Sequence, residues 1–235
     1  MFFDPVYFIF VGPGLLLSWW ASSRVKKTFV KYGQVGVSSG MTGMQAAAAV
    51  CRAGGANEIT IERVGGFLSD HYDPRSKTLR LSPDVYEGRS ISAIAVGAHE
   101  AGHAIQHAVK YPWLSYRSAI VPLVQFGNRA YIWPIMLGAM LQSSPIGSTL
   151  VLIGVGLLGI TVLFQLITLP VEFDASNRAK KVLADSGITR NDEEYSGVDK
   201  VLDAAALTYI AGAISSLLTL AYFVYRYLGT SRRHG

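Results

Sequence analysis

The chain has 235 residues, of which 50% are hydrophobic and only 16% are charged, and its mean hydropathy is positive at +0.31. This composition excludes an ordinary soluble protein. The net charge of +5 fits basic residues beside membrane spans, which set orientation and meet anionic lipid, so we infer no nucleic-acid binding. Cys51 is the only cysteine, which excludes an intrachain disulfide and a cysteine-rich zinc cage.

Long runs without a charged residue predict membrane-spanning helices. The runs cover residues 5–23, 130–171 and 204–225, and each is near or above the roughly 20 residues that cross a hydrocarbon core. The polar, Pro- and Gly-containing segment 142–147 divides the middle run and predicts a turn between two spans. We therefore expect a mainly α membrane protein with about four transmembrane helices, over 1–23, 113–142, 146–169 and 204–228.

The first span carries an orientation signal. Its only early charge is Asp4, whereas signal peptides usually open with basic residues. We therefore interpret this segment as a membrane span that is not cleaved, and a cleaved signal peptide is the lesser alternative. Basic residues follow the span at Arg24, Lys26, Lys27 and Lys31. The positive-inside bias then places the N-terminus outside the cell and the following segment in the cytoplasm.

Residues 24–112 are polar enough to form a compact α+β insert between the first two spans. The alanine-rich segment 41–52 predicts a helix ending at Gly54 and Gly55. Alternating residues predict strands over 58–64 and 78–82, with a turn-rich loop at 70–74 between them. The second strand could pair with an extended substrate or could form a structural hairpin only.

The segment 90–109 predicts an amphipathic helix that carries a metal motif. Ser90 is a plausible N-cap, and an apolar stripe recurs at helical spacing through Ile94, Ala98, Ala101, Ile105 and Val109. His99 and His103 lie four residues apart on the opposite side of this helix, so both imidazoles can bind one Zn²⁺. Glu100 between them can act as general base. Two ordinary helix histidines are the alternative.

The segment 118–142 is the hardest to interpret because Asn128 and Arg129 interrupt apolar sequence that also contains two prolines. An arginine at mid-bilayer is costly unless it is paired or faces protein. Either a long kinked helix enters the membrane here, or Arg129 faces the interior of the helix bundle.

The second polar segment, 170–203, carries five basic residues and follows the third span. Pro170 fits a helix start or a kink, with a charged helix continuing to Leu183. With four spans, the polar segments 24–112 and 170–203 both face the cytoplasm and both termini lie outside. This orientation leaves three arginines on the outer side, against the positive-inside bias, namely Arg226, Arg232 and Arg233. The two cytoplasmic segments contain more basic residues than the outer side, and this larger number decides the orientation.

A catalytic zinc ion needs a third protein ligand. His107 lies eight residues after His99, about 12 Å along a straight helix, which is too far for three imidazoles to share one ion. His71 could approach from its loop, although a turn or substrate-side role fits it better. The stronger candidates are Glu172 and Asp174, which follow a span on the same side as the metal helix.

At this point the chain resembles a known family, the bacterial integral-membrane neutral zinc metallopeptidases, with a more distant similarity to gluzincins of the HtpX and CAAX-prenyl-protease type. The resemblance is carried by motifs spread over most of the chain, at 69–74, 79–82, 99–106, 170–176 and 204–209. It implies a zincin-like catalytic insert over 24–112 and one zinc ion held by His99, His103 and Glu172, with Glu100 as base.

Two positions qualify this resemblance. HtpX-type proteases usually place an aspartate four residues after the ligand glutamate, where it orients a zinc histidine, and this chain has Ser176 there. A hydroxyl can still accept an N–H hydrogen bond without bringing charge, and Asp174 or Asp203 could substitute. Tyr209 is a candidate donor to the oxyanion of the reaction, and a buried helix tyrosine is its alternative reading.

These observations predict a membrane-embedded zinc endopeptidase whose partners are a protein or peptide substrate and the lipid membrane. A site-2-type intramembrane protease is the second reading, because 90–109 is long enough to enter a bilayer, but Arg89 and Lys110 flank it and no later aspartate motif of that type is present. A non-catalytic membrane scaffold stabilised by zinc is the third. A transporter fits less well, because only the Arg129 region places an ionisable residue within a span.

Overall fold

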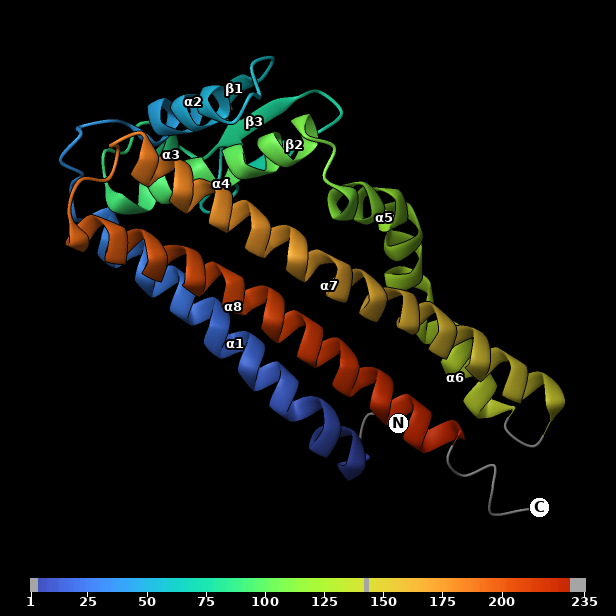
Figure 1. The fold of residues 1–235 in the computed structure, drawn as a ribbon. Helices are drawn as coiled ribbons and strands as arrows, with labels where there is room; N and C mark the ends of the chain where they lie inside the picture. Colours follow the sequence, from blue (N-terminus) through green and yellow to red (C-terminus); the bar gives the residue numbers. More distant parts are fainter. Residues whose placement is uncertain (1–3, 142–143, 229–235) are drawn as a thin grey trace. The chain divides into compact units, whose positions relative to one another are not determined.

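The computed structural model describes residues 4–141 and 144–228. Residues 1–3 of the first expected span, Gln142 and Ser143 of the expected turn, and Arg232 and Arg233 lie outside the described residues. The elements, shown in Figure 1, are α1 (Pro5–Gly33), α2 (Gly43–Ala53), β1 (Thr60–Arg63), β2 (His71–Asp73), β3 (Thr78–Leu81), α3 (Pro83–Tyr86), α4 (Ile91–Ala108), α5 (Pro112–Ala130), α6 (Ile132–Met140), α7 (Pro145–Asp185), α8 (Asp192–Phe223) and a π-helical turn η1 (Val224–Leu228).

The chain divides into two compact units. The first, here called the apolar helical unit, contains the described residues of 1–20, 116–169 and 209–235. The second, here called the mixed unit, contains 21–115 and 170–208. Each unit is assembled from segments that are far apart in the sequence, so the long helices α1, α7 and α8 each contribute to both.

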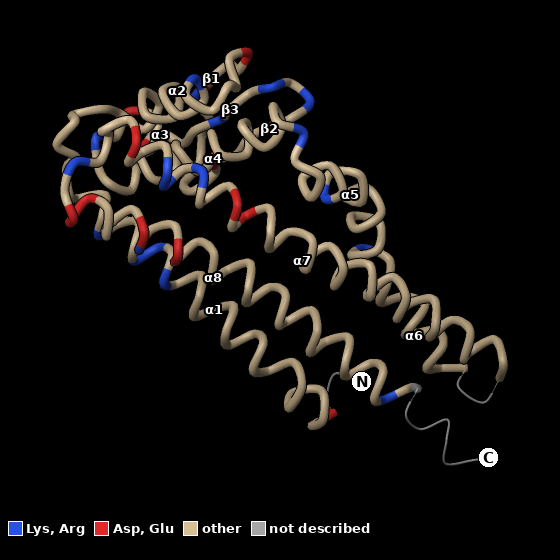
Figure 2. The backbone as a smooth tube through the Cα atoms, in the orientation of Figure 1, with Lys and Arg blue, Asp and Glu red and all other residues tan. Residues whose placement is uncertain are grey.

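Three helices among the described residues are long and apolar enough to cross a membrane, namely α1, α7 and α8 with its π-helical continuation. They contain the spans expected at the N-terminus, at 146–169 and at the C-terminal end. Figure 2 shows long stretches without charged residues in these helices and in α6. Pro170 lies inside α7 instead of beginning a new helix, so the span and the charged segment after it form one continuous helix.

The span expected over 113–142 does not form a single helix. The segment is divided into α5 and α6 at Tyr131, and neither is among the three candidate spans. Helix α5 continues through Pro122, and the break falls three residues before Pro134, which has no backbone N–H to donate to the carbonyl of Ala130.

Helix α6 packs closely against the first part of α7 within the apolar helical unit. A Cβ added at Gly138 would lie 2.6 Å from the carbonyl oxygen of Gly147, and one added at Gly154 would lie 2.7 Å from that of Tyr131. Farther along, Thr161 donates a hydrogen bond to the side chain of Asn128 at 2.7 Å. Residues that come earlier in α5 and α6 therefore meet later residues of α7, so the two segments run antiparallel.

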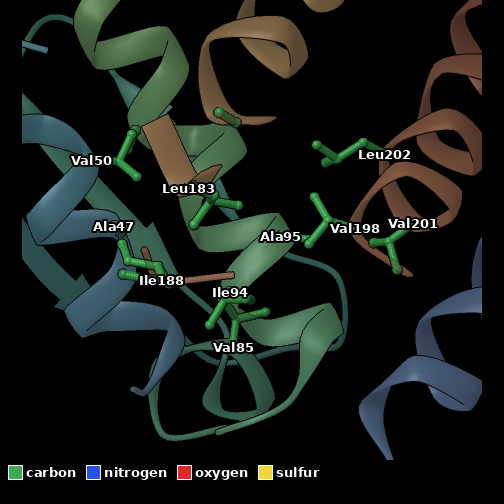
Figure 3. Close-up of a cluster of buried hydrophobic side chains, with 14 of the residues drawn as sticks. Ala47, Val50, Val85, Ile94, Ala95, Leu183, Ile188, Val198, Val201 and Leu202 are labelled. Carbon is green, nitrogen blue, oxygen red and sulfur yellow. The ribbon is translucent and has the colours of Figure 1, made fainter. Parts of the chain in front are cut away.

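The core of the mixed unit is built around α4. The side chain of Ser90 accepts a hydrogen bond from the backbone N–H of Ala93, which confirms the expected N-cap. Nearly every residue of α4 from Ile91 to Gln106 is buried, whereas Val109, expected in the apolar stripe, is 52% exposed. Figure 3 shows the surrounding cluster, to which α2, α3, α4, α7 and α8 contribute.

Helix α2 lies against α4 through close backbone contact. Its N-cap is Thr42, which forms a reciprocal capping box with Gln45, and its end at Gly54 confirms the sequence expectation. A Cβ added at Gly97 of α4 would lie 2.5 Å from the carbonyl oxygen of Gly43. The absence of a side chain at Gly97 is therefore what lets the two backbones approach.

A three-stranded sheet in the order β1-β3-β2 completes the mixed unit. β1 and β3 confirm the two predicted strands and pair in parallel. The turn-rich loop expected at 70–74 is wrong in its centre, because His71–Asp73 form β2, antiparallel to β3. β3 is hydrogen-bonded on both edges, so it has no free edge to pair with a substrate, and the hairpin alternative holds.

Candidate metal centre

The site begins with the two histidines of α4. His99 and His103 are 8% and 7% exposed, and their ring centroids lie 4.8 Å apart with the ring planes at 83°. A helix places residues four positions apart on the same face, so the two rings converge on one side of α4. That side is closed by α7.

Helix α7 brings Glu172 to the histidines. Its carboxylate Oε2 lies 3.2 Å from Nε2 of His99 and 3.4 Å from Nε2 of His103, and the residue is 2% exposed. Gly102 makes this approach possible, because a Cβ there would lie 2.5 Å from the carbonyl oxygen of Ala175. The ligand atoms of the three residues lie within 4.8 Å of one another.

This donor set fits a zinc ion. Two imidazole nitrogens and one carboxylate oxygen are a ligand combination found in catalytic zinc sites, which keep a further position open. Both histidines use Nδ1 in other hydrogen bonds, so Nε2 is the atom that each directs toward Glu172. The structure thus brings together the three residues that the sequence predicted as metal ligands.

Each histidine has a different hydrogen-bond partner behind it. Nδ1 of His99 lies 3.1 Å from the hydroxyl of Ser176, so the serine does occupy the supporting position. Nδ1 of His103 lies 3.0 Å from Oε1 of Gln106. Gln106 was not among the predicted site residues, although its position three residues after His103 places it on the same helix face.

The aspartates expected as substitutes do not contact an imidazole. Asp174 accepts hydrogen bonds from Gln106 and Arg178 through Oδ2, at 2.8 and 2.6 Å. Asp203 pairs with Lys180 at 3.1 Å. Asp174 therefore reaches His103 only through Gln106, and Asp203 has a separate role in an ion pair.

Burial and the neighbouring carboxylates act in opposite directions on the pKa of His103. Burial of the imidazole lowers the pKa, but the hydrogen bond and negative charge of Glu172 outweigh it, with further contributions from Glu100 and Gln106. The net effect raises the pKa of His103 above its usual value. In the metal-free protein this histidine therefore holds a proton to higher pH than a free imidazole does.

Glu100 lies between the histidines on α4 and is 9% exposed. A second carboxylate is near it, since the charge of Glu100 contributes to raising the pKa of Asp70, although burial of Asp70 is the larger cause. Asp70 accepts hydrogen bonds from the backbone N–H and the hydroxyl of Ser82, at 2.7 and 3.1 Å. Its carboxylate thus ties the loop before β2 to the start of α3.

The other two histidines considered as ligands, His107 and His71, make hydrogen bonds elsewhere in the mixed unit. His107 is hydrogen-bonded through Nδ1 to the hydroxyl of Tyr72 at 2.7 Å. His71 is exposed and contacts the carbonyl oxygen of Ser69 at 2.8 Å. Neither belongs to the group of convergent ligand atoms among the described residues. Tyr209 lies in α8, in the apolar helical unit, and its role toward an oxyanion stays a prediction.

Two histidines on one helix and a glutamate from a second, partly apolar helix form the kind of donor set that zinc peptidases use. Residues 7–228 match the family described as "Putative neutral zinc metallopeptidase". The chain is also 48% identical over 223 residues to "Putative membrane protease YugP" from Bacillus subtilis (strain 168), covering 94% of this chain and 96% of the relative. No solved structure matches the chain. The protein therefore belongs to the bacterial membrane zinc peptidase family, which confirms the resemblance.

Proposed function

We propose that the protein is a membrane-anchored zinc endopeptidase. The observation that carries the proposal is the convergence of Nε2 of His99, Nε2 of His103 and the carboxylate of Glu172 within 4.8 Å. The histidine and glutamate side chains would hold one zinc ion, which supplies Lewis-acid activation of water and of the peptide carbonyl when bound. The names of the family and of its relative support the same activity.

Glu100 is the residue that would move the proton in this reaction. It follows His99 directly on α4, so its carboxylate can lie beside the ligands without binding the metal itself. As general base it takes a proton from the attacking water, and as general acid it passes that proton to the leaving amine. Tyr209 remains the proposed donor to the oxyanion.

The division into units supports four membrane crossings. The mixed unit contains residues on both sides of 116–169, so with this unit on one face of the membrane the chain would cross an even number of times within that segment. The first part of α7 would provide one crossing, and α5 with α6 would provide the other. Their antiparallel contacts with α7 extend from Gly147 to Thr161, about 21 Å of helix, which supports this second crossing.

The proposed orientation places the mixed unit in the cytoplasm, as the basic residues after the first span indicate. Cysteine labelling in a Cys51→Ser background tests it. A Ser144→Cys variant should react with a membrane-impermeant reagent on intact cells, and a Ser186→Cys variant should react only after lysis. The reverse pattern would contradict the orientation.

The placement of α4 favours this function over intramembrane cleavage. Helix α4 contacts α2, α3 and the sheet of the mixed unit, and it is not among the helices of the described chain that are long and apolar enough to span a membrane. A site at the end of a span, served by a polar unit, is the arrangement expected for cleavage of substrate segments outside the hydrocarbon core.

Replacing Glu100 with Gln tests the reaction directly. The variant should retain the parental zinc content and lose proteolysis of casein or of a membrane-protein substrate by at least about 100-fold, because general acid–base catalysis contributes 10²–10⁴-fold. Glu193→Gln, the same change at an exposed position, should behave like the parent. Cleavage by Glu100→Gln at the parental rate would contradict the mechanism. Zinc binding by a parent that cleaves nothing would favour the scaffold reading.

A further inference from the structure

The side chain of Gln106 is surrounded by three polar partners and has no exposed surface. Its Oε1 lies 3.0 Å from Nδ1 of His103. Its Nε2 donates to the carbonyl oxygen of Val171 at 2.7 Å and to Oδ2 of Asp174 at 2.8 Å. A buried amide with each of its ends engaged can orient its neighbours as well as itself.

The partners of Gln106 determine which way its amide faces. A backbone carbonyl and a carboxylate both act as hydrogen-bond acceptors, so the NH₂ end must face Val171 and Asp174. A flipped amide would place its oxygen against two acceptor oxygens. The amide oxygen therefore faces His103, and the hydrogen bond between them requires the proton to be on Nδ1 of His103.

We propose that Gln106 is a positioning residue that fixes His103 in the tautomer with a proton on Nδ1 and a lone pair on Nε2. That lone pair is directed to the place where the carboxylate of Glu172 lies 3.4 Å away. The inference rests on the proposed function in taking a zinc ion as the occupant of this place. Gln106 itself does not touch the metal or the substrate.

Asp174 and Arg178 hold the far end of this arrangement. Nε of Arg178 donates to Oδ2 of Asp174 at 2.6 Å, the same oxygen that accepts from Gln106. The guanidinium also lies over the ring of Tyr111, 5.7 Å from its centroid, which restricts its position. Asp174 thus contributes a fixed acceptor for the amide, and it acts on His103 only through Gln106.

The hydrogen-bond partner of His99 does not select one tautomer of its imidazole. Ser176 Oγ, which contacts Nδ1 of His99, can either donate or accept a hydrogen bond, so it allows both tautomers of His99. Ser176, one helical turn after Glu172 on α7, contacts His99 through its hydroxyl. Asp174 and Arg178, also one turn apart on α7, act on His103 through the amide of Gln106, whose direction is fixed.

Zinc affinity of the full-length protein in detergent tests the proposal without any need for proteolysis. Gln106→Leu keeps the approximate volume and removes the amide, and we expect the zinc affinity to fall about 10–100-fold, the range for lost partners of zinc histidines. Ser176→Ala should lose less. Gln34→Leu, the same change at an exposed position, should match the parent. The visible spectrum of the cobalt-loaded Gln106→Leu variant should shift, because the His103 ring is no longer oriented.

A second variant separates amide orientation from charge and remains informative if Gln106→Leu does not fold. Asp174→Asn removes the charge but retains an oxygen that can accept from both Gln106 and Arg178. We expect its zinc affinity to stay within about threefold of the parent, the effect of weakening one hydrogen bond. A loss beyond about tenfold would show that the carboxylate charge supports the site, and it would overturn the proposal.

The outcomes distinguish this inference from the proposed function. A parent that binds zinc and cleaves substrate, together with a Gln106→Leu variant whose affinity is parental or falls no more than that of Ser176→Ala, overturns the inference alone. A parent that binds no zinc overturns both. Reduced affinity with a shifted cobalt spectrum in Gln106→Leu, and near-parental affinity in Asp174→Asn, supports the role of Gln106.

Discussion

On two sides of α4, a glycine allows close approach of a neighbouring helix, but the side chains packed around the two contacts differ. Toward α2, Gly97 lets the backbone of α4 approach Gly43, and the side chains packed around this contact are apolar. Toward α7, Gly102 lets the backbone approach Ala175, but the side chains there are His99, His103 and their polar partners. Close helix packing stabilises the fold on the first side and brings a third ligand to the histidines on the second.

The two sides of α4 differ in what they require of the fold. Buried polar groups are unfavourable unless their hydrogen bonds are satisfied, and the α7 side of α4 buries two imidazoles, a carboxamide and a carboxylate together. An apolar contact such as that with α2 would stabilise the fold without this requirement. The polar side is therefore the side that carries the proposed zinc site, and changes to its side chains should affect zinc more than folding.

The largest expected effect is the loss of zinc from the polar side. Glu172→Gln keeps the size of the side chain but replaces the carboxylate ligand, and we expect the zinc affinity to fall by more than the roughly 100-fold that marks loss of an outer partner. Competition with a chromogenic chelator measures it. Glu193→Gln serves as the matched control, and parental affinity in Glu172→Gln would remove Glu172 from the ligand set.

Paired glycine substitutions compare the two sides directly. Alanine at Gly97 or at Gly102 would place a Cβ 2.5 Å from a backbone oxygen of the facing helix, so each should lower the free energy of unfolding by about 1–3 kcal/mol through overpacking. Only Gly102→Ala should also weaken zinc binding, because it displaces α7 and Glu172.

Chemical denaturation and zinc titration of both glycine variants measure these effects. Gly65→Ala, at an exposed position where a Cβ meets nothing within 4 Å, is the control for the substitution itself. Equal losses of zinc affinity in Gly97→Ala and Gly102→Ala would show that the two sides of α4 are not separable.

A smaller effect is expected from pH. The metal-free protein holds a proton on His103 to higher pH than usual, because its pKa is raised, and zinc must displace that proton. At pH values below this pKa, the apparent zinc affinity should therefore increase about tenfold for each unit by which the pH is raised. At pH values above this pKa, the affinity should level off. Zinc titrations between pH 5.5 and 8.5 measure the slope, and an affinity that increases toward acid pH would contradict the assignment.

Local sequence patterns predicted the parts of the site that one element contains. The spacing of His99 and His103, the N-cap at Ser90 and the apolar stripe defined α4 because helix geometry depends on neighbours within a few residues. Long apolar runs likewise located the regions of α1, α7 and α8 that can span a membrane. Glu172 was one of two candidates until the family resemblance selected it.

Features that depend on distant residues could not be predicted in this way. β2 is three residues long and exists because it pairs with β3, so its own sequence indicated only a turn. The sequence left Pro170 as either a helix start or a kink, since proline often marks a helix boundary, and the structure shows α7 continuing through it. Gln106 had no distinguishing pattern, because its role arises from Val171 and Asp174, more than sixty residues later.

X-ray absorption at the zinc edge tests whether two histidines and one glutamate hold a single zinc ion. The zinc-loaded parent should show two imidazoles with Zn–N at about 2.0–2.1 Å and oxygen scatterers at about 2.0–2.2 Å. Each of His99→Ala and His103→Ala should remove one imidazole contribution. A third imidazole in the parent would contradict the proposed site, and so would a Zn–S distance of about 2.3 Å, which would assign the sulfur of Cys51 as a ligand.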